Sequence, residues 1–423
     1  MTRSGKPVKV IPLPAAATPP ASAAPQAAPV DTSSPLPLPR ESGTPGPRVP
    51  RNSVRIFLAD APRTPFTLGF TGPFALYSND QKNGILDTPC QATLHQNTLR
   101  LNGQSLPLPI RLIPLSEAAL FRFDGRTYSG NLLVRTDSTG KPILVNELPM
   151  ESYLKGVLPY EIGKRDSTCF EALKAQAVVA RTYSYARLNR HESSGFDLYP
   201  DESDQVYRGI EGRYPLSDAA VDATRNLVLT HADTLIQTYY FSTSPCKTAN
   251  IEEVWPDKGF RPYLRSVNDS RYNTSSKYFT WQEEWTGAEL EKIINRFGRE
   301  TFANFQPGTL NDLRILDRAE CGRTKTTLIV LSGREYRVNG DRVRFVLRRP
   351  EKNNPILRSA FFTLDIKRTV TGKIKSVIAL GGGFGHGVGL SQIGAVQMSQ
   401  SGMTFTRILD TYYADTRLQQ VNP

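Results

Sequence analysis

The carboxylate with the clearest chemical potential is Glu161, near the end of the segment Glu147-Leu-Pro-Met-Glu-Ser-Tyr-Leu-Lys-Gly-Val-Leu-Pro-Tyr-Glu-Ile162. It follows a proline and lies on a short connection that leads into a strongly patterned helix. Neighbouring Val157, Leu158 and Ile162 give it a partly apolar setting, and burial raises the pKa of a carboxyl group because it disfavours the charged form. A carboxyl group that holds its proton near neutral pH can act as a general acid. We therefore predict that Glu161 is a general acid.

The element that must position Glu161 is predicted to be a helix from Cys169 to about Asn189. This stretch contains no Gly or Pro and is rich in good helix formers. Thr168 and Glu171 have the spacing of a capping box at its start. One face is small and apolar, and it consists of Phe170, Leu173, Ala177, Ala180 and Ser184. Lys174 and Arg181 are seven residues apart, so they share another face and are predicted to line a cleft near Glu161.

A glycine-rich segment, Gly381-Gly-Gly-Phe-Gly-His-Gly-Val-Gly389, follows a predicted strand, Ser376–Leu380, and opens a predicted helix that ends near Gly402. A loop of this kind can bind a dinucleotide, and Asp410 falls about 20 residues further on, where a ribose-binding acid is expected. However, no βαβ unit surrounds the loop, and Asp410 lies in a helix-like stretch. His386 is better interpreted as a pocket residue that can donate or accept a hydrogen bond near neutral pH.

A third segment, Thr234–Asn250, begins as a predicted strand because it is rich in β-branched and aromatic residues. Its Ser-Thr-Ser-Pro cluster then predicts a loop. Further on, Glu252–Trp255 and Arg261–Val267 supply aromatic and basic groups. Hydroxyls, amides and aromatic faces of this kind suit the binding of a sugar polymer.

Together, and in this order, these segments resemble the SpoIID/LytB family of peptidoglycan-active proteins. The resemblance extends from about Ser53 to Tyr413. Its matching pieces are Asn146–Glu161, Glu171–Tyr183, Gln205-Val-Tyr-Arg-Gly209, Phe241-Ser-Thr-Ser244, Pro262–Val267 and Gly385-His-Gly-Val-Gly-Leu-Ser-Gln392. The resemblance implies a lytic transglycosylase whose catalytic glutamate is Glu161 and whose basic cleft residues are Lys174 and Arg181. Further substrate contacts are expected from Gln205, Tyr240, Ser242, Ser244, His386, Gly387, Ser391 and Gln392.

The implied chemistry needs one carboxyl group. Ordinary glycosidases use two, whereas a lytic transglycosylase uses the C6 hydroxyl of its own substrate as the nucleophile. Glu161 would protonate the glycosidic oxygen between MurNAc and GlcNAc. It would then accept the proton of the C6 hydroxyl, leaving a 1,6-anhydro-MurNAc end. The expected substrate is a glycan strand without peptides. Cations close by would hinder protonation of Glu161, so Lys174 and Arg181 are assigned to substrate carboxylates or to the architecture.

The chain departs from the family pattern at two places, of which the first bears on metal binding. Some members carry two cysteines before the Gln-Val-Tyr motif that can contribute to a metal site, but Asp197–Asp204 contains none. Many relatives have a histidine where this chain has Phe241. Cys90, Cys169, Cys246 and Cys321 lack the spacing of a zinc site. We expect no metal and no cofactor, while a site built by His231 and Cys246, and a Cys90–Cys321 pair, both stay open.

The resemblance implies a location at the cell envelope, and the composition is compatible with it. Residues 1–50 are dominated by Pro, Ala and Ser and are predicted to be a disordered linker. No secretory signal is visible after Met1, and no stretch approaches the roughly 20 apolar residues of a membrane span. The net charge of +12 comes from dispersed cations without a nucleic-acid motif. It suits an enzyme that meets anionic wall polymers in the periplasm or the extracytoplasmic wall.

The predicted fold is α+β, with a strand-rich core, a long helix beside the catalytic cleft and an inserted β subdomain. The family-like region, 51–423, divides into a mainly β part (51–147), the catalytic helix and strands (148–267), a β-rich subdomain (268–375) and the glycine loop with C-terminal helices (376–423).

Four further elements are expected. They are a helix from Ser217 (its N-cap) to Asn226, a helix from the Thr286–Glu289 capping box to Gly298, and strands at Thr326–Leu331 and Val343–Leu347.

Two other functions stay open. One is a non-catalytic wall-binding module that enhances an N-acetylmuramoyl-L-alanine amidase, and the other is an envelope domain with an unrelated activity. The enzyme is favoured because Glu161 stands at the motif position.

Overall fold

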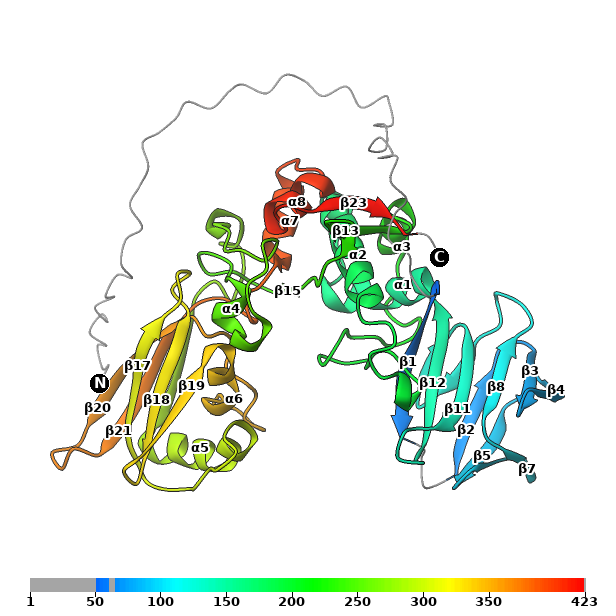
Figure 1. The fold of residues 1–423 in the computed structure, drawn as a ribbon, viewed down its shortest axis with the longest axis horizontal. Helices are drawn as coiled ribbons and strands as arrows, with labels where there is room; N and C mark the ends of the chain where they lie inside the picture. Colours follow the sequence, from blue (N-terminus) through cyan, green and yellow to red (C-terminus); the bar gives the residue numbers. More distant parts are fainter. Residues whose placement is uncertain (1–50, 61–64, 422–423) are drawn as a thin grey trace, which may run out of the picture. The chain divides into compact units, whose positions relative to one another are not determined.

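The computed structural model describes residues 51–60 and 65–421. The segment predicted to be a linker, residues 1–50, lies outside the described residues. The described residues form one compact unit. Several separate sheets and clusters of helices make up this unit, which confirms the predicted α+β class (Figure 1). None of the described helices has the length and apolar character that would let it cross a membrane.

Two antiparallel sheets occupy the N-terminal part of the described chain. The first has the order β1-β12-β11-β8-β3-β4, with bounds Ser53–Asp60, Pro142–Pro149, Asn131–Thr136, Ile110–Pro114, Phe74–Ser78 and Gln81–Leu86. The second has the order β10-β9-β2-β5-β6-β7, with bounds Arg126–Tyr128, Phe121–Phe123, Phe66–Phe70, Cys90–His95, Thr98–Leu101 and Gln104–Pro107. Alternating residues such as Val54 and Ile56 are buried, as expected for strands with one face on a core. These strands end where the first helix begins.

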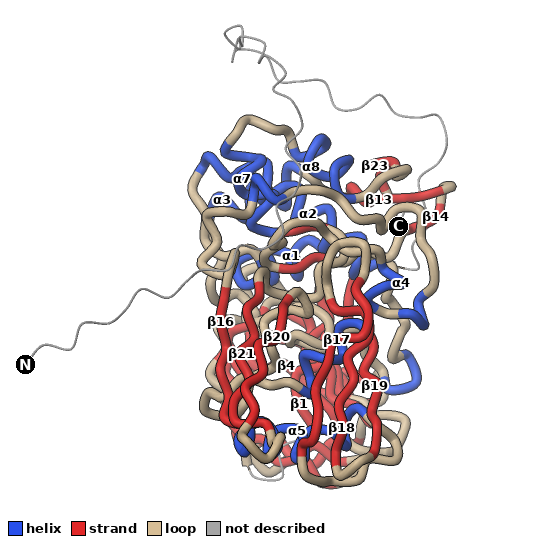
Figure 2. The backbone as a smooth tube through the Cα atoms, turned by 90° about the vertical axis from the view of Figure 1, so that its left-hand side faces the viewer, coloured by secondary structure: helices blue, strands red, loops and turns tan. Residues whose placement is uncertain are grey.

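A group of helices follows the N-terminal sheets. They are α1 (Met150–Glu161), α2 (Phe170–Tyr185), α3 (Pro215–Ala223), α4 (Ile251–Val254), α7 (Gln392–Gln400) and α8 (Phe405–Tyr412). Helix α2 contacts α1, α3, α7 and α8, and Figure 2 shows these helices gathered together. Because α2 is rich in alanine, its neighbours can approach from several sides, and most of its residues are buried. The central position of α2 thus follows from its small side chains.

Short strands tie this helical group together. One sheet has the order β14-β13-β23, with bounds Thr234–Leu235, Leu227–His231 and Arg417–Gln420. A second consists of two parallel strands, β15 (Tyr240–Phe241) and β22 (Leu390–Ser391). This pair joins the Thr234–Asn250 segment to the end of the glycine loop, so that two regions far apart in the sequence lie side by side.

The inserted β subdomain has its own hydrophobic core. Its sheets have the orders β16-β21-β20 (Trp281–Thr286, Ile374–Gly381, Phe362–Arg368) and β17-β18-β19 (Leu310–Arg318, Thr324–Leu331, Arg334–Asn339). Helix α5 (Gly287–Thr301) contacts β16 and β21, and the short α6 (Val343–Val346) contacts α5. The predicted capping box is confirmed, since Thr286 Oγ1 accepts from the Glu289 N–H at 3.2 Å and Glu289 Oε2 accepts from the Thr286 N–H at 2.9 Å.

Helix α5 continues three residues past Gly298, where the sequence predicts its end. The glycine serves packing instead of termination: a Cβ at this position would lie 2.3 Å from the Phe305 ring. The predicted strand Val343–Leu347 is also wrong, because most of it forms α6. Arg344 is buried there and bonds to Asp341 at 2.9 Å and to the Leu357 carbonyl at 2.7 Å. Ion pairing three residues apart favours a helical turn over the strand that the β-branched residues predict.

Three boundaries near Glu161 also differ from the sequence prediction. Glu161 is the last residue of α1, not part of an irregular connection, although Pro159 lies within that helix. The capping box predicted at Thr168 is wrong, since Asp166 accepts from the Thr168 N–H at 3.0 Å and caps a preceding 3-10 turn. Ser217 is not an N-cap, because α3 begins two residues earlier, at Pro215. Proline suits the first helical position, where its missing N–H costs nothing.

Candidate active site

Glu161 combines partial exposure with an elevated pKa. Its side chain is half-buried at the end of α1, and its Oε1 accepts a hydrogen bond from the Val206 backbone N–H at 2.8 Å. Burial raises the pKa of Glu161 to about 7, against the lowering effect of the bonds from Val206 and from the Tyr240 hydroxyl, and the negative charge of Glu202 raises it further. At neutral pH a substantial fraction of Glu161 is therefore protonated and within reach of solvent.

A buried amide fixes the tyrosine that contacts Glu161. The Gln205 side chain has no exposed surface; its Oε1 accepts from the Ser184 hydroxyl at 2.8 Å and from the Tyr153 hydroxyl at 3.2 Å. Its Nε2 donates to the Tyr240 hydroxyl at 3.1 Å. The Tyr240 hydroxyl accepts this bond and so has its proton directed to the Glu161 carboxylate. Gln205 thus orients the site and does not itself face substrate.

The loop that carries Gln205 and Val206 is held against α1. The Tyr207 hydroxyl donates to Asn146 Oδ1 at 2.8 Å, and the ring of Tyr207 lies against Gly156. A Cβ at Gly156 would come within 2.6 Å of that ring and 2.4 Å of the Gly209 carbonyl oxygen. A glycine inside a helix is unfavourable, and here close packing of the loop explains it. Asn146, Gly156 and Tyr207 therefore place the Val206 N–H beside Glu161.

The two cations predicted to line the cleft have different surroundings. Arg181 has no exposed surface: it donates to Glu151 Oε1 and Oε2 at 2.9 and 2.6 Å and to the carbonyls of Leu227 and Val221. Lys174 is half-buried, pairs with Glu171 at 2.5 Å and lies over the Phe405 ring at 4.8 Å. The position of Arg181 fits the architectural role that the sequence left open, and it leaves no surface for a substrate carboxylate.

His386 is fully engaged by the backbone. Its Nδ1 accepts from the Val388 N–H at 3.0 Å, so Nε2 carries the proton and donates to the Tyr240 carbonyl at 2.9 Å. Burial lowers the pKa of His386 to about 4, so the ring is neutral near pH 7. Neither nitrogen is left for a substrate, in contrast to the interpretation of His386 as a hydrogen-bonding pocket residue. The ring instead joins the glycine loop to the strand that carries Tyr240.

The remaining predicted residues divide into framework and surface. Ser391 is buried; its Oγ donates to Asn273 Oδ1 at 2.7 Å and caps α7. Ser244 is buried and donates its N–H to the same Asn273 oxygen at 3.0 Å. Gln392 is also buried. Ser242 is half-buried, with its hydroxyl 3.2 Å from that of Thr243.

Gly387 belongs to the framework as well. It has a φ of +93°, and a Cβ there would lie 2.4 Å from the Arg323 side chain. The Gly387 position therefore combines a left-handed backbone with a close approach, and both favour glycine. Among the predicted substrate contacts, Lys174, Tyr240, Ser242 and His386 keep exposed surface.

Sequence reasoning missed three parts of this site. Val206 contributes only its backbone N–H, so its side chain gives no signal. Tyr153 lies within α1, and its side chain is buried in the hydrophobic core. Glu202 belongs to the acidic stretch Asp197–Asp204, and the several carboxylates of this stretch are the sequence signal that indicates it.

The stability of the protein should report the pKa of Glu161 without any assay of activity. An unfolded carboxyl group ionises near pH 4.5, whereas Glu161 in the folded chain ionises near pH 7. Between these values the unfolded chain binds fewer protons, so the parent loses stability as the pH rises. Glu161→Gln cannot ionise, and we expect it to match the parent at pH 4 and to exceed its free energy of unfolding by on the order of 1–3 kcal/mol at pH 8.

Urea denaturation of both proteins at several pH values measures this difference. A difference that stays constant from pH 4 to pH 8 would show that the folded carboxyl group titrates normally.

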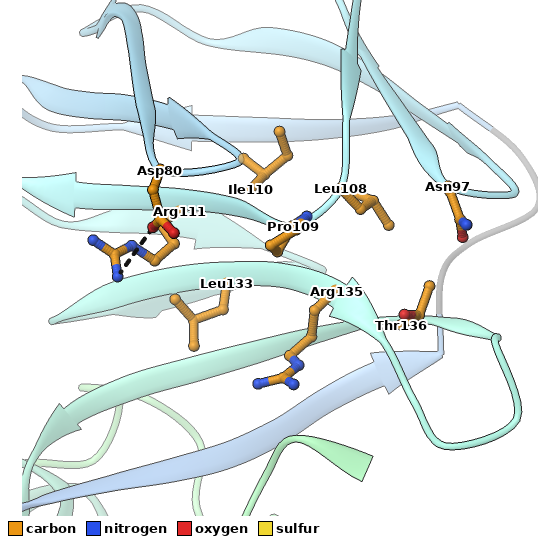
Figure 3. A pocket seen from close by; sticks show the side chains of 9 residues that line it. All are labelled: Asp80, Asn97, Leu108, Pro109, Ile110, Arg111, Leu133, Arg135 and Thr136. Atoms are coloured by element: carbon orange, nitrogen blue, oxygen red, sulfur yellow. Dashed lines mark ion pairs between the residues drawn. The ribbon is translucent and has the colours of Figure 1, made fainter. Parts of the chain in front are cut away.

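Two cavities lie elsewhere in the described structure, and neither includes a predicted site residue. One, of about 370 Å³, is lined by residues of the adjacent strands β8 and β11 and of the loop before β8, and Arg111 and Asp80 in its lining form an ion pair of 3.7 Å (Figure 3). The other, of about 800 Å³, lies at the start of α1 and is lined by Glu151, Ser152 and Lys155 among others. The Glu161 side chain therefore lines neither of these two cavities.

The structure bears on two open points of the sequence analysis, a Cys90–Cys321 disulfide and a metal site. Cys90, Cys169, Cys246 and Cys321 are all free thiols, so the Cys90–Cys321 pair does not form. Within residues 51–60 and 65–421, no three His, Cys, Asp or Glu side chains are grouped so that they could hold a metal ion.

Two parts of the chain match known protein families. Residues 138–231 match the SpoIID family, described as Stage II sporulation protein, and residues 264–389 match a domain of unknown function, DUF8618. The first match contains Glu161 and α2, and the second contains the whole β subdomain from β16 to β21.

Three relatives illustrate the similarity. An uncharacterized protein of Brachyspira hyodysenteriae is 29% identical over 366 residues, covering 86% of this chain and 92% of that protein. Stage II sporulation protein D of Bacillus subtilis is 27% identical over 297 residues, covering 66% of this chain and 76% of that protein. The amidase enhancer of Bacillus subtilis is 27% identical over 304 residues, covering 63% of this chain but only 40% of that protein. The chain therefore carries a SpoIID-family domain at residues 138–231, and relatives that bear these two names are similar to it well beyond that domain.

Proposed function

We propose that this protein is a peptidoglycan lytic transglycosylase in which Glu161 acts first as general acid and then as general base. The observation that carries the proposal is a half-buried carboxyl group with a pKa of about 7, held by a backbone N–H and by the Tyr240 hydroxyl. General acids work best when their pKa lies near the working pH. A family whose members are named for sporulation and for amidase enhancement supports peptidoglycan as the substrate.

The reaction needs no second catalytic carboxylate. Protonated Glu161 gives its proton to the oxygen that links C1 of MurNAc to GlcNAc, and the C1–O bond breaks with the electron pair going to that oxygen. The C6 hydroxyl of the same MurNAc then forms a bond to C1, and ionised Glu161 takes its proton. The products are a GlcNAc hydroxyl end and a 1,6-anhydro-MurNAc end. Tyr240 and the Val206 N–H would hold the carboxylate during the interval between the two proton transfers.

This activity places the protein at the cell envelope. The glycan strands of the cell wall would be most accessible to the protein after a wall amidase has removed their peptides. We therefore propose an N-acetylmuramoyl-L-alanine amidase as a functional partner. The relative named amidase enhancer supports that partnership.

Mass spectrometry of the products tests the function. Purified glycan strands, intact and amidase-treated, are incubated with the parent protein and with Glu161→Gln. Ends of 1,6-anhydro-MurNAc, formed by the parent alone, are the expected result. Reducing ends would show hydrolysis by water instead, and no cleavage of either substrate would contradict the enzyme.

A second function, a glycan-binding module that enhances an amidase without cleaving glycan, is supported by the same relative's name. It requires binding but no general acid. Glu161→Gln would then enhance an added amidase as well as the parent does, whereas a transglycosylase that assists the amidase through cleavage would lose this effect.

Burial of Glu161 should mainly set the upper pH limit of activity, and Glu202 should extend that limit to a somewhat higher pH. Its side chain is exposed, and its negative charge contributes to the raised pKa of Glu161. Removing that charge in Glu202→Gln lowers the pKa of Glu161, so the decline of cleavage rate at alkaline pH should begin at a lower pH, while the rate at acidic pH stays close to that of the parent. The pH dependence of the cleavage rate measures this. An unchanged alkaline limb would show that Glu202 does not act on Glu161.

A further inference from the structure

Two cations and three aromatic rings form a group beside the Glu161 site, here called the Tyr239 cluster: Tyr183, Arg187, Tyr239, Trp255 and Lys258. The Arg187 guanidinium lies 3.5 Å from the centre of the Tyr183 ring and 5.4 Å from that of Tyr239. Lys258 Nζ donates to the Tyr239 hydroxyl at 2.7 Å and lies 4.4 Å from the centre of the Trp255 ring. Both cations therefore converge on one tyrosine, from two distant parts of the chain.

The Tyr239 cluster borders the catalytic group through direct contacts. Tyr239 precedes Tyr240, whose hydroxyl contacts Glu161. The Tyr183 ring lies edge-on to the Tyr240 ring, with centres 6.5 Å apart. The centre of the Trp255 ring lies 4.9 Å from that of the His386 ring, and His386 bonds to the Tyr240 carbonyl. A sugar bound at the cluster would therefore be a near neighbour of a sugar bound at Glu161.

Both cations of the cluster have N–H groups that form no hydrogen bond within the described residues. Within the described residues neither Arg187 nor Lys258 forms an ion pair with a carboxylate, and both are half-buried. Arg187 uses one N–H in a long bond of 3.4 Å to the Tyr183 carbonyl, and Lys258 uses one of its three in the bond to Tyr239. By contrast, Arg190 nearby pairs with Asp204. Withdrawing a cation partly from water without an anion is unfavourable, so a site that holds two of them favours an anionic ligand.

The geometry points to a subsite for an acidic sugar: we propose that Arg187 and Lys258 bind the carboxylate of a saccharide whose ring packs on the half-exposed Trp255. This inference rests on the proposed function, because the muramic unit of peptidoglycan carries a lactyl carboxylate. That carboxylate is free only where no peptide is attached, so the Tyr239 cluster would be the part of the protein that recognises the peptide-free substrate which the family resemblance already implies. This recognition comes from residues that the catalytic step does not use.

Binding experiments in the Glu161→Gln background test the subsite without turnover. The probes are amidase-stripped glycan strands and the same strands after their lactyl carboxylates have been converted to methylamides. We expect strands with free carboxylates to bind at least tenfold more tightly than the amidated strands. Adding Arg187→Gln or Lys258→Gln should weaken binding of the free strands about tenfold each, the usual size for one charged hydrogen bond, and change binding of the amidated strands little.

Two controls separate the subsite from general effects. Arg296→Gln removes an exposed cation that lies over the Phe297 ring at 5.0 Å in α5, and it should leave the preference for free carboxylates intact. If it reduced that preference as much as Arg187→Gln does, the net positive charge and not the cluster would be responsible. Arg187→Lys keeps a positive charge at the site and should retain part of the preference for free carboxylates over amidated ones. The unfolding midpoints of Arg187→Lys and Arg187→Gln are compared, so that a difference in binding is not caused by a difference in stability.

The outcomes distinguish the subsite from the proposed function. Equal affinity for free and amidated strands overturns the subsite, even if the parent protein cleaves glycan. An equal loss of affinity for both probes in Arg187→Gln and Lys258→Gln also overturns it, because the cations would then support only the shape of the site. A preserved preference for carboxylates in a protein that cleaves nothing sustains the subsite and contradicts the transglycosylase.

Discussion

Glu161→Gln should slow glycan cleavage by about a hundred- to ten-thousand-fold, the usual contribution of a positioned acid–base group. Glutamine keeps the shape of the protonated side chain and can still accept from the Val206 N–H, which lies 2.8 Å from Oε1 in the parent. It cannot deliver a proton to the leaving oxygen. Glycan binding should therefore change little, and the loss should appear in the rate of the bound complex. Single-turnover cleavage of amidase-stripped strands, with binding measured separately, tests this expectation.

The parent protein should also show the protonation state that this role requires. Because the pKa of Glu161 is raised to about 7, the fraction of protein with a protonated acid falls as the pH rises through that value, and the cleavage rate should fall with it. Glu192→Gln is a suitable control because Glu192 is exposed. It should keep both the rate and the pH profile of the parent. Comparable losses in the two variants would remove Glu161 from the mechanism.

Arg181→Met should lower the free energy of unfolding by about 3–5 kcal/mol, since removing one partner of a buried ion pair leaves the other charge without compensation. Arg181 has no exposed surface, and its guanidinium binds both oxygens of Glu151, which is also buried. Adding Glu151→Leu removes the stranded charge, so the double variant should regain part of the lost stability. Urea denaturation at pH 7 measures all three proteins.

Lys174→Met is the matched control on the same helix. Lys174 is half-buried and its pair with Glu171 is reached by solvent, so the expected loss is below about 1 kcal/mol. Equal losses in the two variants would mean that the Arg181 pair contributes no more than a surface contact. A large loss of glycan affinity in Lys174→Met, at unchanged stability, would identify Lys174 as the cation of this helix that meets substrate.

Several features could be predicted because their causes are local. The capping box at Thr286 and Glu289 depends on residues three apart, and the helical character of α2 depends on an uninterrupted run of good helix formers. The α+β class follows from separated stretches of alternating and helical pattern. The short-range errors have local competitors: Asp166 caps the turn before α2 more directly than Thr168 can, and Gly298 is kept for its contact with Phe305.

The candidate acid itself was predictable, but its surroundings were not. Residue type and apolar neighbours pointed to Glu161 and to a raised pKa. The Val206 N–H and the Gln205 amide reach the site through a loop held by Asn146 and Gly156, and no spacing along the chain specifies that contact. A backbone donor carries no side-chain signature, so only the folded chain reveals it.

The sequence therefore specifies which groups can do chemistry, since acidity, charge and helix formation belong to the residue and its near neighbours. Tertiary structure decides which of those groups are available. Arg181 and His386 have the right chemical types, yet burial against Glu151 and against the backbone of Tyr240 and Val388 commits them to the framework. Arg187 and Lys258 gave no signal in the sequence, but the fold brings them together at Tyr239 without a carboxylate partner among the described residues. Whether a charge is paired or free depends on long-range contacts, and those are set by packing and not by spacing.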